Sequence, residues 1–287
     1  MAGEKQKPVE LKDVTHEQAF GPGGCKFNVT NGVAKITLSR PDRMNAMSYK
    51  LSLGLWKAIE ECEQRVGDIR VVVLCAEGRM FCAGADAQEL AGRGKIEGPL
   101  VRLPGAGEMW KRLSTLPQPL IGLAQGGAYG GGFGMLCCCD IVAAVREAKF
   151  ALSEVRLGMI PATISPYVIE RIGVRNARRL FLTGEAFSAE TARDVGVVND
   201  VVDGPEGLQK ALDGYLKDFT QCAPKAVAAA KSLILNVKGR PFDDALTKYT
   251  EKELAKVRAS DEVKEGSTAL LEKRKKRWEA TPMVAKL

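Results

Sequence analysis

Hydrophobic and polar residues alternate along the first two thirds of the chain in patterns that predict strands and helices in turn. Residues 33–38 alternate as a strand does, and residues 120–124 form another apolar strand. Residues 70–75 (Arg-Val-Val-Val-Leu-Cys) are an almost continuous apolar run, which is typical of a strand buried on both faces. The pattern therefore predicts an α/β protein.

Helical spacing fills the segments between and after these strands. Ser48 is placed to cap a helix that carries Leu51, Leu55, Ile59 and Cys62 on one face. Further helices are predicted through residues 109–113 and 131–138, after Ser188, and at 206–219, 224–237, 242–257 and 260–277, with a brief strand near 197–202. We divide the chain into a polar N-terminal arm (1–25), a core (26–203) and a C-terminal helical region (204–287).

Histidine and cysteine usage excludes several kinds of catalytic site. The chain of 287 residues has one histidine, His16, so Ser-His-Asp and Cys-His arrangements and the H-E-x-x-H zinc motif lack their parts. Its eight cysteines show no paired C-x-x-C spacing, and no metal site is predicted. We interpret Cys137–Cys139 and Cys82 as small buried residues, because no histidine is at hand to activate a thiol.

The net charge of +7 comes largely from one run at residues 273–277, Lys-Arg-Lys-Lys-Arg. We interpret this run as a solvated helix face. The more specific alternatives are that the run binds coenzyme phosphates or nucleic acid. No apolar segment approaches the length that spans a membrane, and the charged start lacks the apolar core of a signal peptide. A cytoplasmic location, or an organellar matrix, and no membrane partner are therefore expected.

Two glycine-rich loops are the main candidates for chemistry. Residues 81–86 (Phe-Cys-Ala-Gly-Ala-Asp) and 126–134 (Gly-Gly-Ala-Tyr-Gly-Gly-Gly-Phe-Gly) each follow a predicted strand, and Glu154 lies downstream. Small residues let the backbone approach a ligand closely, so each loop can direct one N–H at the same oxygen. A nearby carboxylate can move protons on the adjacent carbon. The combination suits the formation of a thioester enolate.

Other interpretations of the glycines fit less well. The stretch Gly-Gly-Gly-Phe-Gly does not match the dinucleotide fingerprint G-x-G-x-x-G, and the Gly-Lys-Ser/Thr ending of a P-loop is absent. Glycines that serve only close packing of helix and strand would explain the second loop taken by itself. The joint occurrence of two loops, Asp140 and Glu154 favours a site.

These segments resemble the crotonase, or enoyl-CoA hydratase/isomerase, superfamily over nearly the whole chain. The resemblance implies that the core (26–203) is a spiral of ββα units and that the C-terminal helices form a homotrimer or a dimer of trimers. It also implies an acyl-CoA substrate, with coenzyme A as part of the substrate and no permanently bound cofactor. The matching segments, in family order, are residues 39–46, 81–86, 130–132, 139–141, 153–158, 160–161 and 182–184.

The resemblance also assigns roles to individual residues. It places the oxyanion hole at the backbone N–H groups of Ala85 and Gly131 and the proton-transferring carboxylate at Glu154. Ala83 matches the position whose carbonyl receives the adenine amino group. Further substrate-binding positions implied by the match are Gly84, Asp86, Gly130 and Gly134, together with Arg43 and Ala46 beside the nucleotide.

One position departs from the family pattern. Two-base hydratases carry a first glutamate where this chain has Gly134, which leaves Glu154 as the single acid/base. We expect the missing side chain to open space for a methyl group on the β-carbon, as in the one-glutamate subgroup linked to 3-methylglutaconyl-CoA. Arg112 and Arg156 are candidates to pair with a distal carboxylate of that substrate.

The sequence therefore predicts reversible hydration and dehydration of a β-methyl, glutaconyl-type acyl thioester. A Δ3,Δ2-enoyl-CoA isomerase remains open, because a 1,3-proton shift needs one carboxylate and the same oxyanion hole. So does a dehydratase that acts on an acyl-carrier-protein thioester in polyketide β-branching. An RNA-binding protein on the same scaffold is a non-enzymatic alternative, disfavoured because no aromatic residues interleave the basic run.

Overall fold

Two β-sheets carry the fold in the computed structural model, which describes residues 14–15, 24–93 and 105–287. The larger sheet has seven strands in the order β1-β2-β3-β4-β6-β8-β11, and the smaller has four in the order β10-β9-β7-β5. The larger sheet comprises β1 (Val14–Thr15), β2 (Cys25–Thr30), β3 (Val33–Leu38), β4 (Val71–Ala76), β6 (Leu120–Ala124), β8 (Ile141–Val145) and β11 (Asp200–Val202). The smaller sheet comprises β5 (Met80–Cys82), β7 (Gly127–Tyr129), β9 (Lys149–Ala151) and β10 (Ala186–Ser188).

The chain alternates between the two sheets. Each of β4, β6 and β8 runs in the parallel part of the larger sheet and leads directly into β5, β7 or β9 of the smaller one. A helical segment follows each of these pairs, so the unit repeats as strand, short strand and helix. The predicted strands at 33–38, 70–75 and 120–124 are present, and the first four residues of β4, Val71 to Leu74, are fully buried. Both faces of this strand are covered, as its apolar run indicates.

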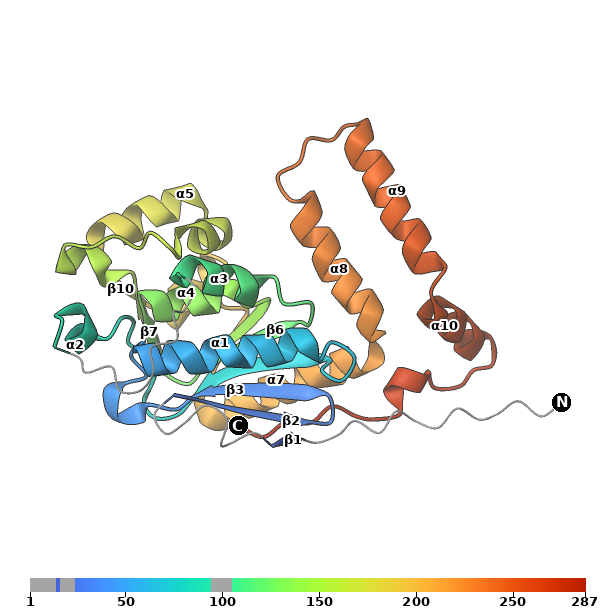
Figure 1. The fold of residues 1–287 in the computed structure, drawn as a ribbon, viewed down its shortest axis with the longest axis horizontal. Coiled ribbons are helices and arrows are strands. Elements are labelled where there is room, and N and C mark those ends of the chain that lie inside the picture. The colour runs from blue at the N-terminus through green and yellow to red at the C-terminus, as the bar shows by residue number, and fades with distance from the viewer. Residues whose placement is uncertain (1–13, 16–23, 94–104) are drawn as a thin grey trace.

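Most helices lie where their spacing predicts them (Figure 1). The Ser48 hydroxyl accepts a hydrogen bond from the Leu51 N–H at 3.3 Å at the start of α1, and Ser188 caps α6 in the same way. The sequence interpretation missed the long α5, which contains a kink at Gly173. The helices are α1 (Tyr49–Gln64), α2 (Ala87–Leu90), α3 (Ala106–Ser114), α4 (Gly131–Cys138), α5 (Ser165–Thr183), α6 (Ala189–Asp194), α7 (Gly204–Gln221), α8 (Pro224–Val237), α9 (Asp244–Arg258) and α10 (Asp261–Leu271).

The predicted helix over 260–277 is wrong in its last turn and a half. Helix α10 ends at Leu271, and Lys273 takes a left-handed backbone conformation with φ of 53°. The basic run is therefore not a helix face. Within it, Arg274 and Arg277 both pair with Glu265, and Lys276 pairs with Glu279 at 2.7 Å. These pairs neutralise much of the charge that suggested a polyanionic partner.

Most of the predicted N-terminal arm, including His16, lies outside the described residues, while Val14–Thr15 pairs with β2 as an edge strand. Within the described part of the chain, no helix has the length and apolar character needed to cross a bilayer.

The C-terminal helices extend away from the two sheets. Figure 1 shows α8 and α9 as an antiparallel pair that stands out from the body of the molecule. The buried Lys231 ammonium of α8 holds this pair to the core, because it contacts the Asp140 carboxylate at 2.6 Å and the Gln118 carbonyl oxygen at 3.1 Å. After α10 the chain returns to the core, where Met283 is buried.

Helix α4 is fixed against the smaller sheet by an aromatic cluster. The Phe133 ring lies 5.7 Å from Phe150 of β9 and 5.4 Å from Phe187 of β10, measured between ring centroids. All three side chains are buried. The first residue of α4 is Gly131, so this packing sets the position of a predicted site residue.

Candidate active site

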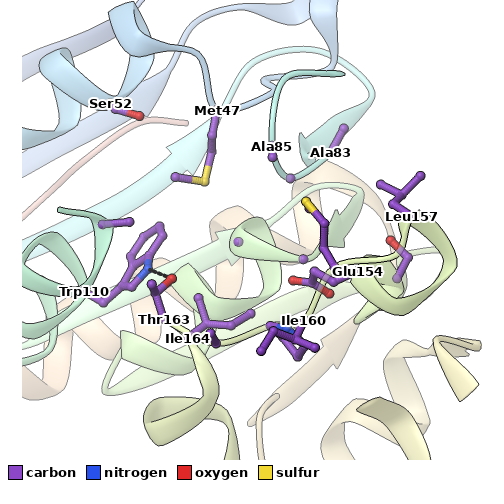
Figure 2. Close-up of a pocket in the computed structure, with 18 residues that line it drawn as sticks. Met47, Ser52, Ala83, Ala85, Trp110, Glu154, Leu157, Ile160, Thr163 and Ile164 are labelled. Atoms are coloured by element: carbon purple, nitrogen blue, oxygen red, sulfur yellow. Dashed lines mark hydrogen bonds between the residues drawn. The ribbon is translucent and has the colours of Figure 1, made fainter. Parts of the chain in front are cut away.

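A cavity of about 370 Å³ opens between the two glycine loops (Figure 2). Of the predicted site residues, it brings together Ala83, Gly84 and Ala85 from the first loop, Gly130 and Gly131 from the second, and Glu154. The rest of the described lining is mostly apolar and includes Met47, Trp110, Met159, Pro161 and Ile164. Glu154 carries the sole titratable side chain among the lining residues that the structure describes.

The first loop presents the amide of Ala85. Residues 47 and 85 form a parallel bridge in which the Met47 N–H donates to the Gly84 carbonyl at 2.7 Å and the Asp86 N–H donates to the Met47 carbonyl at 3.3 Å. In a parallel pairing of this kind, the N–H of the residue between those two bonds points to the opposite edge. The Ala85 N–H is therefore left for a ligand.

The preceding segment is pinned by Asn45, whose side chain is fully buried. Its Nδ2 donates to the carbonyl oxygens of Glu77 and Met80, both at 2.8 Å, and its Oδ1 accepts from the Arg40 N–H at 2.8 Å. Asn45 itself has φ of 52°, in the left-handed region that asparagine tolerates better than most residues. These bonds hold the backbone on which the Ala85 loop rests.

Asp86 has a structural role, and its predicted substrate contact stays a prediction. It does not line the cavity; its Oδ2 accepts from Arg40 at 2.6 Å, and its Oδ1 caps α2 by accepting from the Gln88 and Glu89 N–H groups. Burial alone would raise the pKa of Asp86, but the hydrogen bonds from Arg40 and the two amides outweigh burial and lower it. The ionised carboxylate thus ties the Arg40 segment to the first glycine loop.

Arg43 and Ala46 lie on the same segment but do not line the cavity. Arg43 is exposed at the end of a short 3-10 helix (Pro41–Arg43), and the Ala46 carbonyl accepts a hydrogen bond from Arg40 at 3.1 Å. Their predicted contact with the nucleotide stays a prediction.

The second loop presents the amide of Gly131 at the N-terminus of α4. The first N–H groups of a helix have no acceptor inside it, and they carry the positive end of the helix dipole. Gly130 precedes the helix with φ of 50°, and a Cβ on it would lie 3.0 Å from Glu154 Oε1. A Cβ on Gly84 would lie 2.8 Å from the Tyr129 carbonyl oxygen, so the two loops touch. Glycine is needed at both positions.

Glu154 lies in the first turn of a 3-10 helix (Ser153–Leu157), with its carboxylate against Gly130. Its Oε2 is buried and has no hydrogen-bond partner among the described residues. Burial raises the pKa of this carboxyl, and a hydrogen bond from its own backbone amide offsets only part of the effect. A carboxylate with a raised pKa accepts a proton readily, and this one lies against Gly130 at the start of α4.

The prediction that Gly134 leaves open space beside the acyl chain is wrong. A Cβ on Gly134 would lie 2.3 Å from Cγ2 and 2.7 Å from Cβ of Ile164, whose side chain fills that volume. Gly134 itself does not line the cavity, whereas Ile164 does. No property of the sequence around Gly134 reveals this, because Ile164 lies thirty positions further along the chain.

Sequence reasoning also missed the opposite wall of the cavity. Trp110 of α3 is almost fully buried, and its Nε1 donates to Thr163 Oγ1 at 3.2 Å (Figure 2). Met47 faces the same space. The one available signal was the amphipathic spacing of α3, which indicates burial but not a ligand.

The two arginines considered for a distal carboxylate do not line the cavity. Arg112 pairs with Glu63 and lies over the Trp56 ring, 4.2 Å from its centroid. The Arg156 Nε donates to the Thr183 carbonyl at 3.4 Å. Among the described residues, no cluster of histidine, cysteine, aspartate and glutamate is arranged to hold a metal ion.

Comparisons with known proteins find a family model and several enzymes to which the chain is similar. Residues 28–281 match the model of the enoyl-CoA hydratase/isomerase family. The chain is 32% identical over 246 residues to the 2,3-dehydroadipyl-CoA hydratase of Escherichia coli, covering 84% of this chain and 93% of that protein. The short-chain-enoyl-CoA hydratase of Clostridium acetobutylicum is 30% identical over 244 residues, covering 85% and 92%.

Solved structures show the same likeness. The crystal structure of an enoyl-CoA hydratase from Shewanella pealeana superposes with a TM-score of 0.82 at 31% identity, covering 91% of this chain and 97% of that one. The predicted α/β spiral and the predicted family resemblance are thereby confirmed.

Proposed function

The chain belongs to the enoyl-CoA hydratase/isomerase family, and on that premise we propose that it adds water reversibly to an α,β-unsaturated acyl-CoA with Glu154 as its single acid/base. The observation that supports this most is the half-buried Glu154 carboxylate, whose Oε2 has no hydrogen-bond partner among the described residues, beside Gly130 at the start of α4. Enzymes of this type need no permanent cofactor, and coenzyme A enters as part of the substrate.

In the proposed reaction the backbone amides act on the carbonyl oxygen of the substrate, and Glu154 acts on its double bond. The thioester oxygen accepts hydrogen bonds from the Ala85 and Gly131 amides, and each such donor is typically worth about 3 kcal/mol where negative charge develops. Ionised Glu154 takes a proton from water as the water oxygen bonds to the β-carbon. The electron pair of the double bond moves to the carbonyl oxygen, and Glu154 then returns the proton to the α-carbon. The net change is addition of H and OH.

The acyl group remains a proposal. We keep the β-methyl group of the sequence prediction, because the described lining next to Glu154 is apolar. A charged distal end finds no arginine or lysine in that lining, so an uncharged chain fits it better than a glutaconyl chain. The single carboxylate also suits a Δ3,Δ2-isomerase, which moves one proton between two carbons.

Mass analysis of products from a thioester panel tests these points. We expect 3-methylcrotonyl-CoA to be hydrated with a higher kcat/KM than 3-methylglutaconyl-CoA. The protein could instead hydrate none of these thioesters, crotonyl-CoA included, and convert a 3-enoyl-CoA to its 2-enoyl isomer. That result would replace the proposed hydratase activity with the isomerase activity. A preference for the glutaconyl substrate would show that a cation outside the described lining reaches the acyl end.

We propose that the protein assembles as a homotrimer, or a dimer of trimers, through its C-terminal helical region. Ile234 of α8 and Leu254 of α9 are 65% and 52% exposed in the single chain, and large exposed apolar side chains on these contacting helices suit an interface. Wild type should sediment as a trimer or hexamer, and Ile234→Asp/Leu254→Asp as a smaller species. Val66→Asp, at an exposed position after α1, serves as the control. A wild-type monomer at every concentration would contradict the proposal.

A further inference from the structure

The Ile164 side chain occupies the place that a side chain on residue 134 would take. A Cβ on Gly134 would lie 2.3 Å from Ile164 Cγ2, 2.7 Å from Cβ and 3.3 Å from Cδ1. Ile164 is only 3% exposed, and it stands just before α5, whose N-terminal turn holds it in place. Any residue larger than glycine at 134 must therefore displace Ile164. A side chain on residue 134 and the Ile164 side chain cannot occupy this volume at the same time.

Helix geometry places this contact beside the acid/base. The Gly134 N–H donates to the Gly130 carbonyl at 3.0 Å, so the two glycines lie one turn apart on the same face of α4. The Glu154 carboxylate rests on Gly130, and the Ile164 side chain rests on Gly134. One turn is about 5.4 Å. Ile164 is therefore the neighbour of the Glu154 carboxylate along the helix, and both line the cavity (Figure 2).

This arrangement determines what the β-carbon of the substrate meets. In the proposed hydration the thioester oxygen binds the Ala85 and Gly131 amides, which requires the α- and β-carbons to lie along the Glu154 carboxylate. A group on the β-carbon that points away from Glu154 then meets Ile164, an apolar wall in place of a second carboxylate. A methyl group on the β-carbon packs against the Ile164 side chain, whereas a hydrogen atom there does not reach it.

We infer that Ile164 is the specificity-determining residue of this site: it bars a second carboxylate from position 134 and selects enoyl thioesters with an alkyl group on the β-carbon. The inference rests on the proposed hydration by Glu154. One methyl group against a fitted apolar wall is worth roughly tenfold or more in kcat/KM. Packing of α5 alone would give Ile164 no influence on the choice between substrates.

The test is a cycle of four proteins: wild type, Gly134→Glu, Ile164→Gly and the double variant. For each we would measure the midpoint of thermal unfolding and the kcat/KM for crotonyl-CoA and 3-methylcrotonyl-CoA. Gly134→Glu should lower the midpoint sharply in the wild-type background and much less when Ile164 is glycine. Such non-additivity reports the contact directly and does not depend on activity.

The kinetic measurements then test the selectivity between the branched and the linear thioester. Ile164→Gly should lower the ratio of branched to linear kcat/KM at least about tenfold, and the double variant should move it further toward crotonyl-CoA by supplying a second carboxylate. Ile164→Val, which retains Cγ2, should keep the ratio near that of wild type.

The outcomes separate this inference from the proposed function. An active wild type whose ratio is unchanged in Ile164→Gly overturns the inference and leaves hydration by Glu154 in place. Equal destabilisation by Gly134→Glu in both backgrounds also overturns it. A wild type that hydrates neither thioester overturns the proposed function and the substrate selection together, while the unfolding cycle still reports whether Ile164 bars residue 134.

Discussion

Glu154→Gln should lower kcat for hydration at least about a hundredfold with little change in KM, because positioned acid/base groups typically contribute 10²–10⁴-fold. The amide keeps the shape of the side chain and cannot take a proton from water. In the proposed site the thioester is bound by backbone amides and the apolar lining of the cavity, so its binding should survive. Steady-state kinetics on the best substrate of the panel measure both constants. Activity within a few-fold of wild type would remove Glu154 from the mechanism.

The pH dependence gives an independent check on the same residue. The proposed hydration starts from ionised Glu154 in the free enzyme, and burial raises the pKa of this carboxyl above the ordinary value of 4.5. The kcat/KM of wild type should therefore rise with pH along a limb centred above 4.5, and Glu154→Gln should lack that limb. Glu147→Gln, at an exposed carboxylate between β8 and β9, is the matched control and should retain it.

Stability should change in the opposite sense to activity. Because the folded-state pKa of Glu154 is raised, the folded protein binds this proton more tightly than the unfolded chain does. The contribution of the group to stability is present at low pH and is lost as pH rises through the folded pKa. Glu154→Gln should thus unfold at a higher temperature than wild type at pH 8, and the difference should shrink as pH falls toward 4.5.

Asn45→Ala should destabilise the protein by about 3 kcal/mol, at roughly 1 kcal/mol for each of three buried hydrogen bonds. It should also reduce turnover at least about tenfold, because one lost oxyanion-hole donor costs 10²–10³-fold and the Ala85 loop rests on this segment. Urea unfolding and hydration kinetics measure the two effects.

Asn45→Gly separates hydrogen bonding from backbone strain, since glycine adopts the φ of 52° without penalty. It should lose the same hydrogen bonds and be slightly more stable than Asn45→Ala. If both variants kept wild-type turnover, the segment around Asn45 would not position the Ala85 amide.

The sequence predicted best what depends on neighbours along the chain. Apolar runs gave β3, β4 and β6, and the spacing from Leu51 to Cys62 gave α1, because these patterns follow directly from burial of one or both faces. The glycine loops were predicted for a similar reason: close approach of backbone needs small residues wherever it occurs. The cavity between them also contains Glu154, whose role stays a prediction.

Predictions failed, or none was made, where the structure depends on a contact with a segment far away in the sequence. The volume beside Gly134 is set by Ile164, and the carboxylate of Asp86 is drawn to Arg40, forty-six positions earlier. The helix predicted to 277 ends at Leu271, where the polar run leaves no apolar face to pack. Periodicity carries no information on such contacts.

The burial of the cysteine thiols determines where the native protein can be labelled. Seven of the eight cysteines are buried and Cys222 is exposed. Burial raises the pKa of Cys82 and Cys139 to about 12, so these thiols carry almost no reactive thiolate at neutral pH. A maleimide dye should therefore label the native protein at Cys222 without any mutation. This residue closes α7 just before α8 begins, so a change in the fluorescence of a dye there with protein concentration would test the proposed assembly through the projecting helices.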